Sequence, residues 1–87
     1  MKDKLIEQYI NRMNYDDIIS FASKHGITLN DKEVALIYKH IKEDWRTIIY
    51  GNPKPILENL KTNIEELTYN KIEDLYYFFK DKYQYYL

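Results

Sequence analysis

The segment from Ile18 to Ile41 constrains the fold of this chain more than any other. It reads IISFASKHGITLNDKEVALIYKHI, and Gly26 follows an apolar run with helical spacing, where a helix ends at a residue able to adopt positive φ. Asn30 and Glu33 have the spacing of a capping box, which marks the start of a second helix. The segment therefore predicts two helices joined by a short turn. Such a unit is either a DNA-reading device or two sides of a small core.

Helix start and stop signals recur along the rest of the chain. We expect a first helix over about residues 2–13, with Asn14 as the N-cap of the next one. Gly51 is a second expected stop with positive φ. Asn52 is expected to cap a following helix and Thr68 the last one.

The helix that starts after Asn30 has an uncertain end, because residues 44–50 are compatible with helix or loop. We favour a break near residues 43–45 and an irregular apolar loop up to Gly51, since residues 47–50 are poor helix formers. The resulting fold class is all-α: a compact bundle of four or five short helices in one domain, residues 1–87.

The apolar residues that repeat with helical spacing are expected to form the core. These are Leu5, Tyr9, Ile10, Ile18, Phe21, Ala22, Ile27, Leu29, Val34, Ile37, Ile41, Leu57, Leu60, Ile64, Leu67, Ile72, Leu75 and Phe79.

Composition narrows the functional classes. The chain has no cysteine, and its N-terminus has no signal peptide, so we expect a cytoplasmic protein without disulfides. No segment has the roughly 20 apolar residues that span a bilayer, so no membrane association is expected. A net charge of −1 disfavours a dedicated nucleic-acid binder. The chain is rich in Ile, Lys, Tyr and Asn, whose codons are A/T-rich. This usage indicates a low-GC Gram-positive bacterium or one of its phages as the source.

DNA binding through residues 31–42 remains an alternative. Ala22 and Gly26 have the spacing of a helix-turn-helix unit. However, the turn after Gly26 exceeds the usual length of about three to four residues. Asp31 and Glu33 would also place two carboxylates where the reading helix meets base edges and phosphates. We therefore favour an ordinary pair of core helices.

Tyrosine is the second unusual feature, with ten in the chain and five in the last twelve residues. Tyr combines a large contact area with a polar tip and is enriched at interaction hot spots. One helix cannot bury all five C-terminal tyrosines in one core, so some are expected to be exposed or to meet a partner. The alternative is that Tyr replaces Phe and Leu at half-buried positions. The predicted partner-binding residues are Trp45, Tyr50, Tyr76, Tyr77, Tyr83, Tyr85 and Tyr86.

Residues with catalytic or metal-binding chemistry are sparse. His25 and His40 lie on different expected helices, and Glu43 follows His40 by three positions. A metal site needs three or four converging ligands, so we expect none, and we expect His40 at a solvated helix rim. The sequence has no Gly-rich phosphate loop and no nucleophile elbow. We therefore expect neither a cofactor nor catalytic residues, and no enzyme.

Three segments carry a resemblance to a known family: FASKHGITLNDKEV, ILENLKTNI and the closing LYYFFKDKY. Their order, with the apolar stretch from Trp45 to Tyr50 between the first two, resembles the YqfT-like family of small uncharacterised proteins of Bacillus-type bacteria. The resemblance covers most of the chain from about Tyr15 and implies a small helical bacterial protein. That family has no assigned activity, so the resemblance adds no mechanism and no site residues.

The expected function is that of a non-enzymatic protein–protein interaction module. It would bind another protein or itself, as a homodimer, through an aromatic C-terminal helix. The first alternative is a DNA-binding regulator that uses residues 31–42. The second alternative is a phage-type inhibitor of a host protein, which fits the size and the aromatic content but leaves no mark of its own in the sequence.

Overall fold

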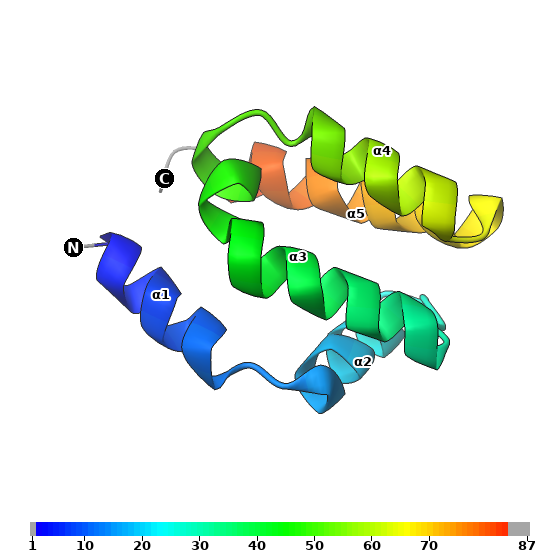
Figure 1. Ribbon diagram of the computed structural model, residues 1–87, viewed down its shortest axis with the longest axis horizontal. Coiled ribbons are helices and arrows are strands. Elements are labelled where there is room, and N and C mark those ends of the chain that lie inside the picture. Colours follow the sequence, from blue (N-terminus) through cyan, green and yellow to red (C-terminus); the bar gives the residue numbers. More distant parts are fainter. Residues whose placement is uncertain (1, 84–87) are drawn as a thin grey trace.

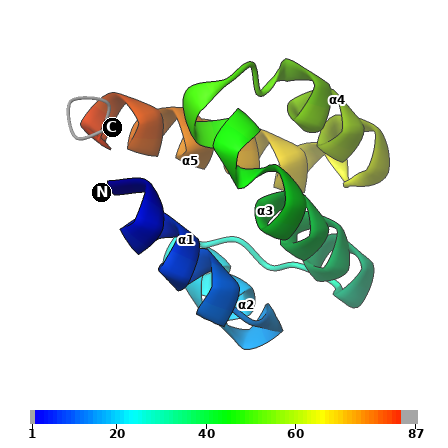
Figure 2. The same ribbon diagram turned by 60° about the vertical axis from the view of Figure 1, so that its left-hand side comes forward.

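The computed structural model describes residues 2–83, and within this range the chain forms five α-helices and no strand. The helices are α1 (Lys2–Arg12), α2 (Tyr15–Lys24), α3 (Asp31–Tyr50), α4 (Lys54–Asn63) and α5 (Glu66–Tyr83). The long helix α3 lies in the middle, with α1 and α2 on one side and α4 and α5 on the other (Figure 1). A second view shows the same arrangement (Figure 2). The expected all-α bundle is confirmed.

Two complete capping boxes start α2 and α3. The Asn14 side chain accepts a bond from the Asp17 backbone N–H (3.0 Å), and the Asp17 carboxylate accepts one from the Asn14 N–H (2.9 Å). Asn30 and Glu33 repeat the arrangement at 2.8 and 2.9 Å. Each box satisfies two backbone donors that a helix start leaves without a partner. The expected caps at Asn14 and Asn30 are confirmed.

The two glycines end their helices for different reasons. Gly26 has φ of 74° and lies in a Schellman motif, in which the Ile27 N–H donates to the Ala22 carbonyl (2.8 Å). Gly51 has φ of −108°, so the positive φ expected there was wrong. Its requirement is space, because a Cβ at position 51 would lie 3.1 Å from the Thr47 carbonyl oxygen.

The starts of the last two helices differ from the expectation. Asn52 accepts a bond from the Lys54 N–H (3.1 Å), but Pro53 occupies the N-cap position of α4. The helix therefore starts one residue later than a cap at Asn52 implies. The cap expected at Thr68 was wrong, because α5 already begins at Glu66 and Thr68 lies inside it.

The break expected near residues 43–45 was also wrong, because α3 continues to Tyr50 without interruption. Long-range packing overrides the weak helix propensity of this segment. Trp45 is buried, and Ile48 packs against the main core. The Ile48 carbonyl also accepts a hydrogen bond from the Tyr76 hydroxyl of α5 (3.2 Å). Residues 44–50 are thus a helix because other helices cover them.

The core extends along both sides of α3. One cluster joins α4 to α5 through Ile56, Leu60, Ile64 and Tyr69. Towards α1 and α2, the buried side chains are Ile10, Ile18, Ala22, Ile27 and Val34. Leu57 and Trp45 complete the buried apolar set among the described residues.

Four residues assigned to the core are instead exposed: Leu5, Tyr9, Phe21 and Leu67. The N-terminal pair is exposed because α1 packs mainly against α3, which covers a narrow face of it. Two side chains of α3 hold this helix in place. Lys42 donates to the carbonyl oxygens of Ile10 and Asn11 at the end of α1, and Arg46 pairs with Glu7 (3.2 Å). A cation at a helix C-terminus also complements the helix dipole.

Replacing Asn30 by Ala is expected to lower the free energy of unfolding by about 1 kcal/mol, because the Glu33 N–H loses its acceptor. Urea unfolding followed by circular dichroism measures the change. Asn70→Ala is the matched control, since Asn70 is exposed inside α5, where Ala favours the helix. Equal stability of Asn30→Ala and Asn70→Ala would contradict the role of the cap.

Buried Tyr69 gives the stability a pH dependence. Burial, followed by the hydrogen bond to Glu73 (2.7 Å), raises the pKa of Tyr69 to about 12. In the unfolded chain the pKa of Tyr is about 10. The folded state thus favours the neutral phenol, and this stabilisation is present below about pH 10 and lost as the pH rises to about 12. The free energy of unfolding, measured with urea, is expected to fall over this window. Tyr69→Phe should reduce the fall, and parallel curves for both proteins would contradict it.

Candidate functional site

Four aromatic rings from α2, its C-cap residue and α5 meet at the surface of the bundle. The Phe21 ring centroid lies 4.7 Å from that of His25 and 5.5 Å from that of Phe79. The Phe79 ring lies 5.5 Å from His25 and 5.4 Å from Phe78. Phe21 is 45% exposed and Phe78 is 56% exposed. We call these four residues the aromatic cluster.

The end of α2 determines where this cluster forms. The Schellman turn at Gly26 stops α2 just before His25 and turns the chain towards α3. The Lys71 ammonium donates to the Gly26 carbonyl (3.4 Å), which connects α5 to this turn. An open groove of about 410 Å³ lies at the junction, lined by His25, Lys71, Asp74, Leu75 and Phe78. The site is therefore an apolar surface with charges of both signs at its rim.

The predicted tyrosines occupy several different positions. Tyr77 is exposed, and its ring lies 5.1 Å from that of half-buried Tyr76. Burial raises the pKa of Tyr76, whose hydroxyl donates to the α3 backbone. Tyr50 is exposed at the C-terminal end of α3, where a hydrogen bond with Asp3 raises its pKa. Tyr85 and Tyr86 lie outside the described residues, as does the side chain of Tyr83.

The prediction that Trp45 binds a partner was wrong, because only 6% of this residue is exposed. The expected break had placed Trp45 at the start of an irregular apolar loop, whereas in the continuous helix α3 this residue is buried. The Arg46 guanidinium lies 4.2 Å from the Trp45 ring centroid and covers its outer side. Trp45 therefore contributes to stability rather than to a surface.

Sequence reasoning missed the aromatic cluster. Phe21 and Phe79 were assigned to the core, and His25 was considered only as a metal ligand. The available signal was the local run of aromatic residues from 76 to 79, which is too wide for one buried face of a helix. No local pattern indicated that α2 would meet this run.

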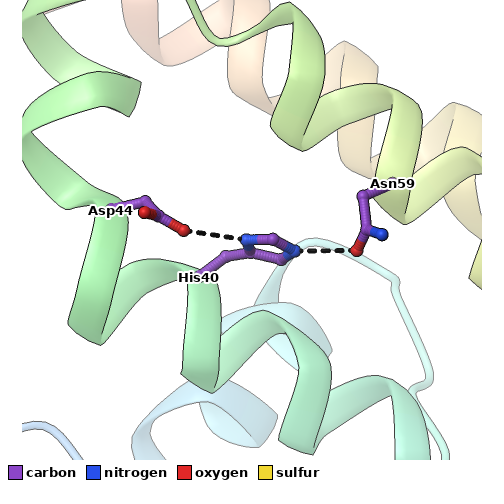
Figure 3. A network of polar contacts seen from close by, with 3 residues as sticks. All are labelled: His40, Asp44 and Asn59. Atoms are coloured by element: carbon purple, nitrogen blue, oxygen red, sulfur yellow. Dashed lines mark hydrogen bonds and ion pairs between the residues drawn. The ribbon is translucent and has the colours of Figure 1, made fainter.

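A second polar site lies between α3 and α4. The Nδ1 atom of His40 lies 3.1 Å from the Asp44 carboxylate, and its Nε2 lies 2.9 Å from the Asn59 side-chain oxygen (Figure 3). The His40 side chain is only 15% exposed, so the expected solvated rim was wrong. Its partner on the same helix is Asp44, four positions further along α3. A groove of about 480 Å³ beside it is lined by Lys32, Leu36, Lys39, His40, Asn59 and Asn63.

This network links two helices through a ring whose nitrogens both have partners. A protonated ring donates to both oxygens, whereas a neutral ring donates to Asp44 and accepts from the Asn59 amide in its rotated orientation. Either form connects α3 to α4. Among residues 2–83, no group of three or more His, Asp or Glu side chains is placed to hold a metal ion. None of the described helices is long and apolar enough to cross a bilayer.

The segment proposed for DNA reading contributes little surface. Within residues 31–42, only Asp31, Lys32 and Lys39 are exposed. Glu33 is buried and its carboxylate is engaged in the capping box. A reading helix needs several free side chains towards its N-terminus. The aromatic cluster is therefore the stronger candidate surface.

The contact between His40 and Asn59 is expected to stabilise the α3–α4 pair. In a double-mutant cycle with His40→Ala and Asn59→Ala, we expect a coupling energy of about 0.5–1.5 kcal/mol. The free energy of unfolding is measured with urea for the original chain, the two single variants and the double variant. The control cycle pairs His40→Ala with Asn63→Ala, because Asn63 lines the same groove but bonds within α4. A coupling energy no larger than that of the control would contradict the link.

No family model, no curated protein and no solved structure matches the chain. The resemblance to the YqfT-like family therefore stays a prediction, since no match tests it. The chemistry and placement of the residues make the aromatic cluster the candidate functional site.

Proposed function

We propose that this protein is a non-enzymatic module that binds a protein partner through the aromatic cluster of α2 and α5. The observation that carries the proposal is the exposure of Phe21 and Phe78 within one set of contacting rings. An absence of cysteine in all 87 residues favours a reducing compartment such as the cytoplasm. The proposed partner is a protein, either another chain or a second copy.

The energetics of the exposed rings support a binding role. Burying one Phe side chain stabilises a complex by about 1.5–3 kcal/mol relative to leaving it in water. Aromatic residues are enriched at protein interfaces, and a few of them supply most of the binding energy. The exposed parts of these rings add nothing to the core of the bundle. A partner that covers the exposed parts of Phe21 and Phe78 would gain the corresponding share of this energy.

Charged residues at the rim of the aromatic cluster would orient a bound partner. Lys71 and Asp74 border the same groove as Phe78 and are both exposed. Exposed charges at a rim contribute little affinity but favour complementary partners over others. We therefore expect a partner that presents an apolar side chain flanked by charges of both signs.

Site-specific photo-crosslinking in cells of the source organism tests the proposal. Phe78 is replaced by p-benzoylphenylalanine, which keeps an aromatic ring at the position. Tyr9→p-benzoylphenylalanine is the matched control, since Tyr9 is also an exposed aromatic residue but lies on α1. After irradiation we expect a discrete protein adduct from position 78 and a much weaker one from position 9.

The adducts formed from positions 78 and 9 distinguish a specific binding surface from non-specific contact. An adduct with this protein or with another protein, specific to position 78, supports the proposal, and mass spectrometry identifies the partner. No adduct from position 78, or equal adducts from both positions, would overturn the assignment of the surface.

A further inference from the structure

The outward face of α5 carries four residues in a regular row. Leu67, Lys71, Asp74 and Phe78 are spaced by four, three and four positions, which places them along one side of a helix. All four are exposed, Leu67 by 69% and Phe78 by 56%. We call this row the outer stripe.

The inner side of α5 is used by the bundle itself. The residues of α5 that contact α3 and α4 are Tyr69, Ile72 and Tyr76. Each is two positions away from a residue of the outer stripe: Tyr69 from Leu67, Ile72 from Asp74 and Tyr76 from Phe78. A step of two residues is a rotation of about 200° around a helix axis. The outer stripe therefore lies nearly opposite the side that packs on α3 and α4, and it borders the turn at the end of α2.

The order of residues in the outer stripe is self-complementary when it is reversed. If two α5 helices lie antiparallel, Lys71 of one copy can meet Asp74 of the other, and Asp74 can meet Lys71. In the same register Leu67 meets Phe78 and Phe78 meets Leu67. All four contacts form together, because the spacing from Leu67 to Lys71 equals that from Asp74 to Phe78. This reciprocity is the property of an interface with twofold symmetry.

A parallel arrangement in register lacks this complementarity. It would bring Lys71 against Lys71 and Asp74 against Asp74, which are like-charge contacts, while the apolar ends would pair equally well. The charges thus select the antiparallel orientation. The groove of about 410 Å³, lined by His25, Lys71, Asp74, Leu75 and Phe78, opens on the same face and offers room for side chains of the second copy.

We propose that the protein forms a homodimer in which the outer stripes of two α5 helices pack antiparallel, with Lys71 of each copy paired with Asp74 of the other. This inference rests on the proposed function, and it names a second copy of the chain as the partner. Phe78 belongs both to the aromatic cluster and to the outer stripe, so the two surfaces are continuous. Leu67 and Phe78, at the two ends of the outer stripe, supply apolar contact area, and the charges of Lys71 and Asp74 between them determine the register.

Sedimentation velocity on purified variants tests the dimer and its register. Lys71→Glu brings two carboxylates together at each charge pair, and Asp74→Lys brings two ammonium groups together. Each single variant is therefore expected to dimerise at least about tenfold more weakly than the original chain. An equimolar mixture of the two variants can form a heterodimer in which one copy presents two acidic side chains and the other two basic ones, so both pairs again join opposite charges. We expect this heterodimer at concentrations at which each single variant alone is mainly monomeric. The double variant Lys71→Glu/Asp74→Lys is expected to dimerise again.

Controls keep the folded state and the net charge comparable. Lys61→Glu and Glu43→Lys change exposed charges on α4 and α3, outside the outer stripe, and are expected to dimerise like the original chain. Lys71→Glu also removes the bond to the Gly26 carbonyl, so circular dichroism confirms the helix content of each variant.

Three outcomes would overturn the inference in distinguishable ways. A monomeric original chain at all concentrations up to about 1 mM, the range of weak association, removes the homodimer. A specific adduct between position 78 and another protein would in that case still support the proposed function. The proposed register would be contradicted if the single variants dimerised as strongly as the original chain. It would also be contradicted if the mixture of the two variants formed no heterodimer.

Discussion

The rest of the structure depends on helix α3, which is the element that contacts α1, α2 and α4. Its start is set by the reciprocal hydrogen bonds of Asn30 and Glu33, and its second half by the burial of Trp45. With a break near Trp45, Ile48 would not reach the α4–α5 cluster, and the Tyr76 hydroxyl would lose its acceptor. The position of α5, and with it the candidate site, therefore follows from the continuity of α3.

Local signals in the sequence predicted the helix boundaries well where they depend on near neighbours. A capping box joins residues three apart, and the Schellman turn at Gly26 joins Ile27 to Ala22, so both are readable from the sequence. The same reasoning failed at Gly51, whose requirement is the close approach of Thr47 rather than positive φ. A glycine that ends a helix has two physical explanations, and the residue type alone does not distinguish them.

Burial was harder to predict because it depends on contacts between distant segments. Apolar spacing gives the direction of a helix face but not whether another helix covers it, and so Leu5 and Phe21 were assigned to the core although they are exposed. Trp45 is the opposite case: it is buried in α3, although the weak helix propensity of its segment led us to expect a loop. The candidate site shares this origin: the α5 half was visible as a run of aromatic residues, while the contact of Phe21 with Phe79 joins positions that no local pattern connects.

Helix α5 shows how one short element can serve two surfaces. Its inner side uses Tyr69 and Ile72 to cover α4, and its outer stripe ends in the apolar residues Leu67 and Phe78. Leu67 was assigned to the core because the last helix was expected to begin only after a cap at Thr68, which left Leu67 on the apolar face of the preceding helix. A monomer gains little from an apolar outer stripe, whereas in a dimer the charges between its ends determine how the copies align. Lys71 and Asp74 at neighbouring turns allow full pairing only when the second helix runs in the opposite direction. Specificity in such an interface would therefore come from the order of two charges rather than from the size of the apolar area.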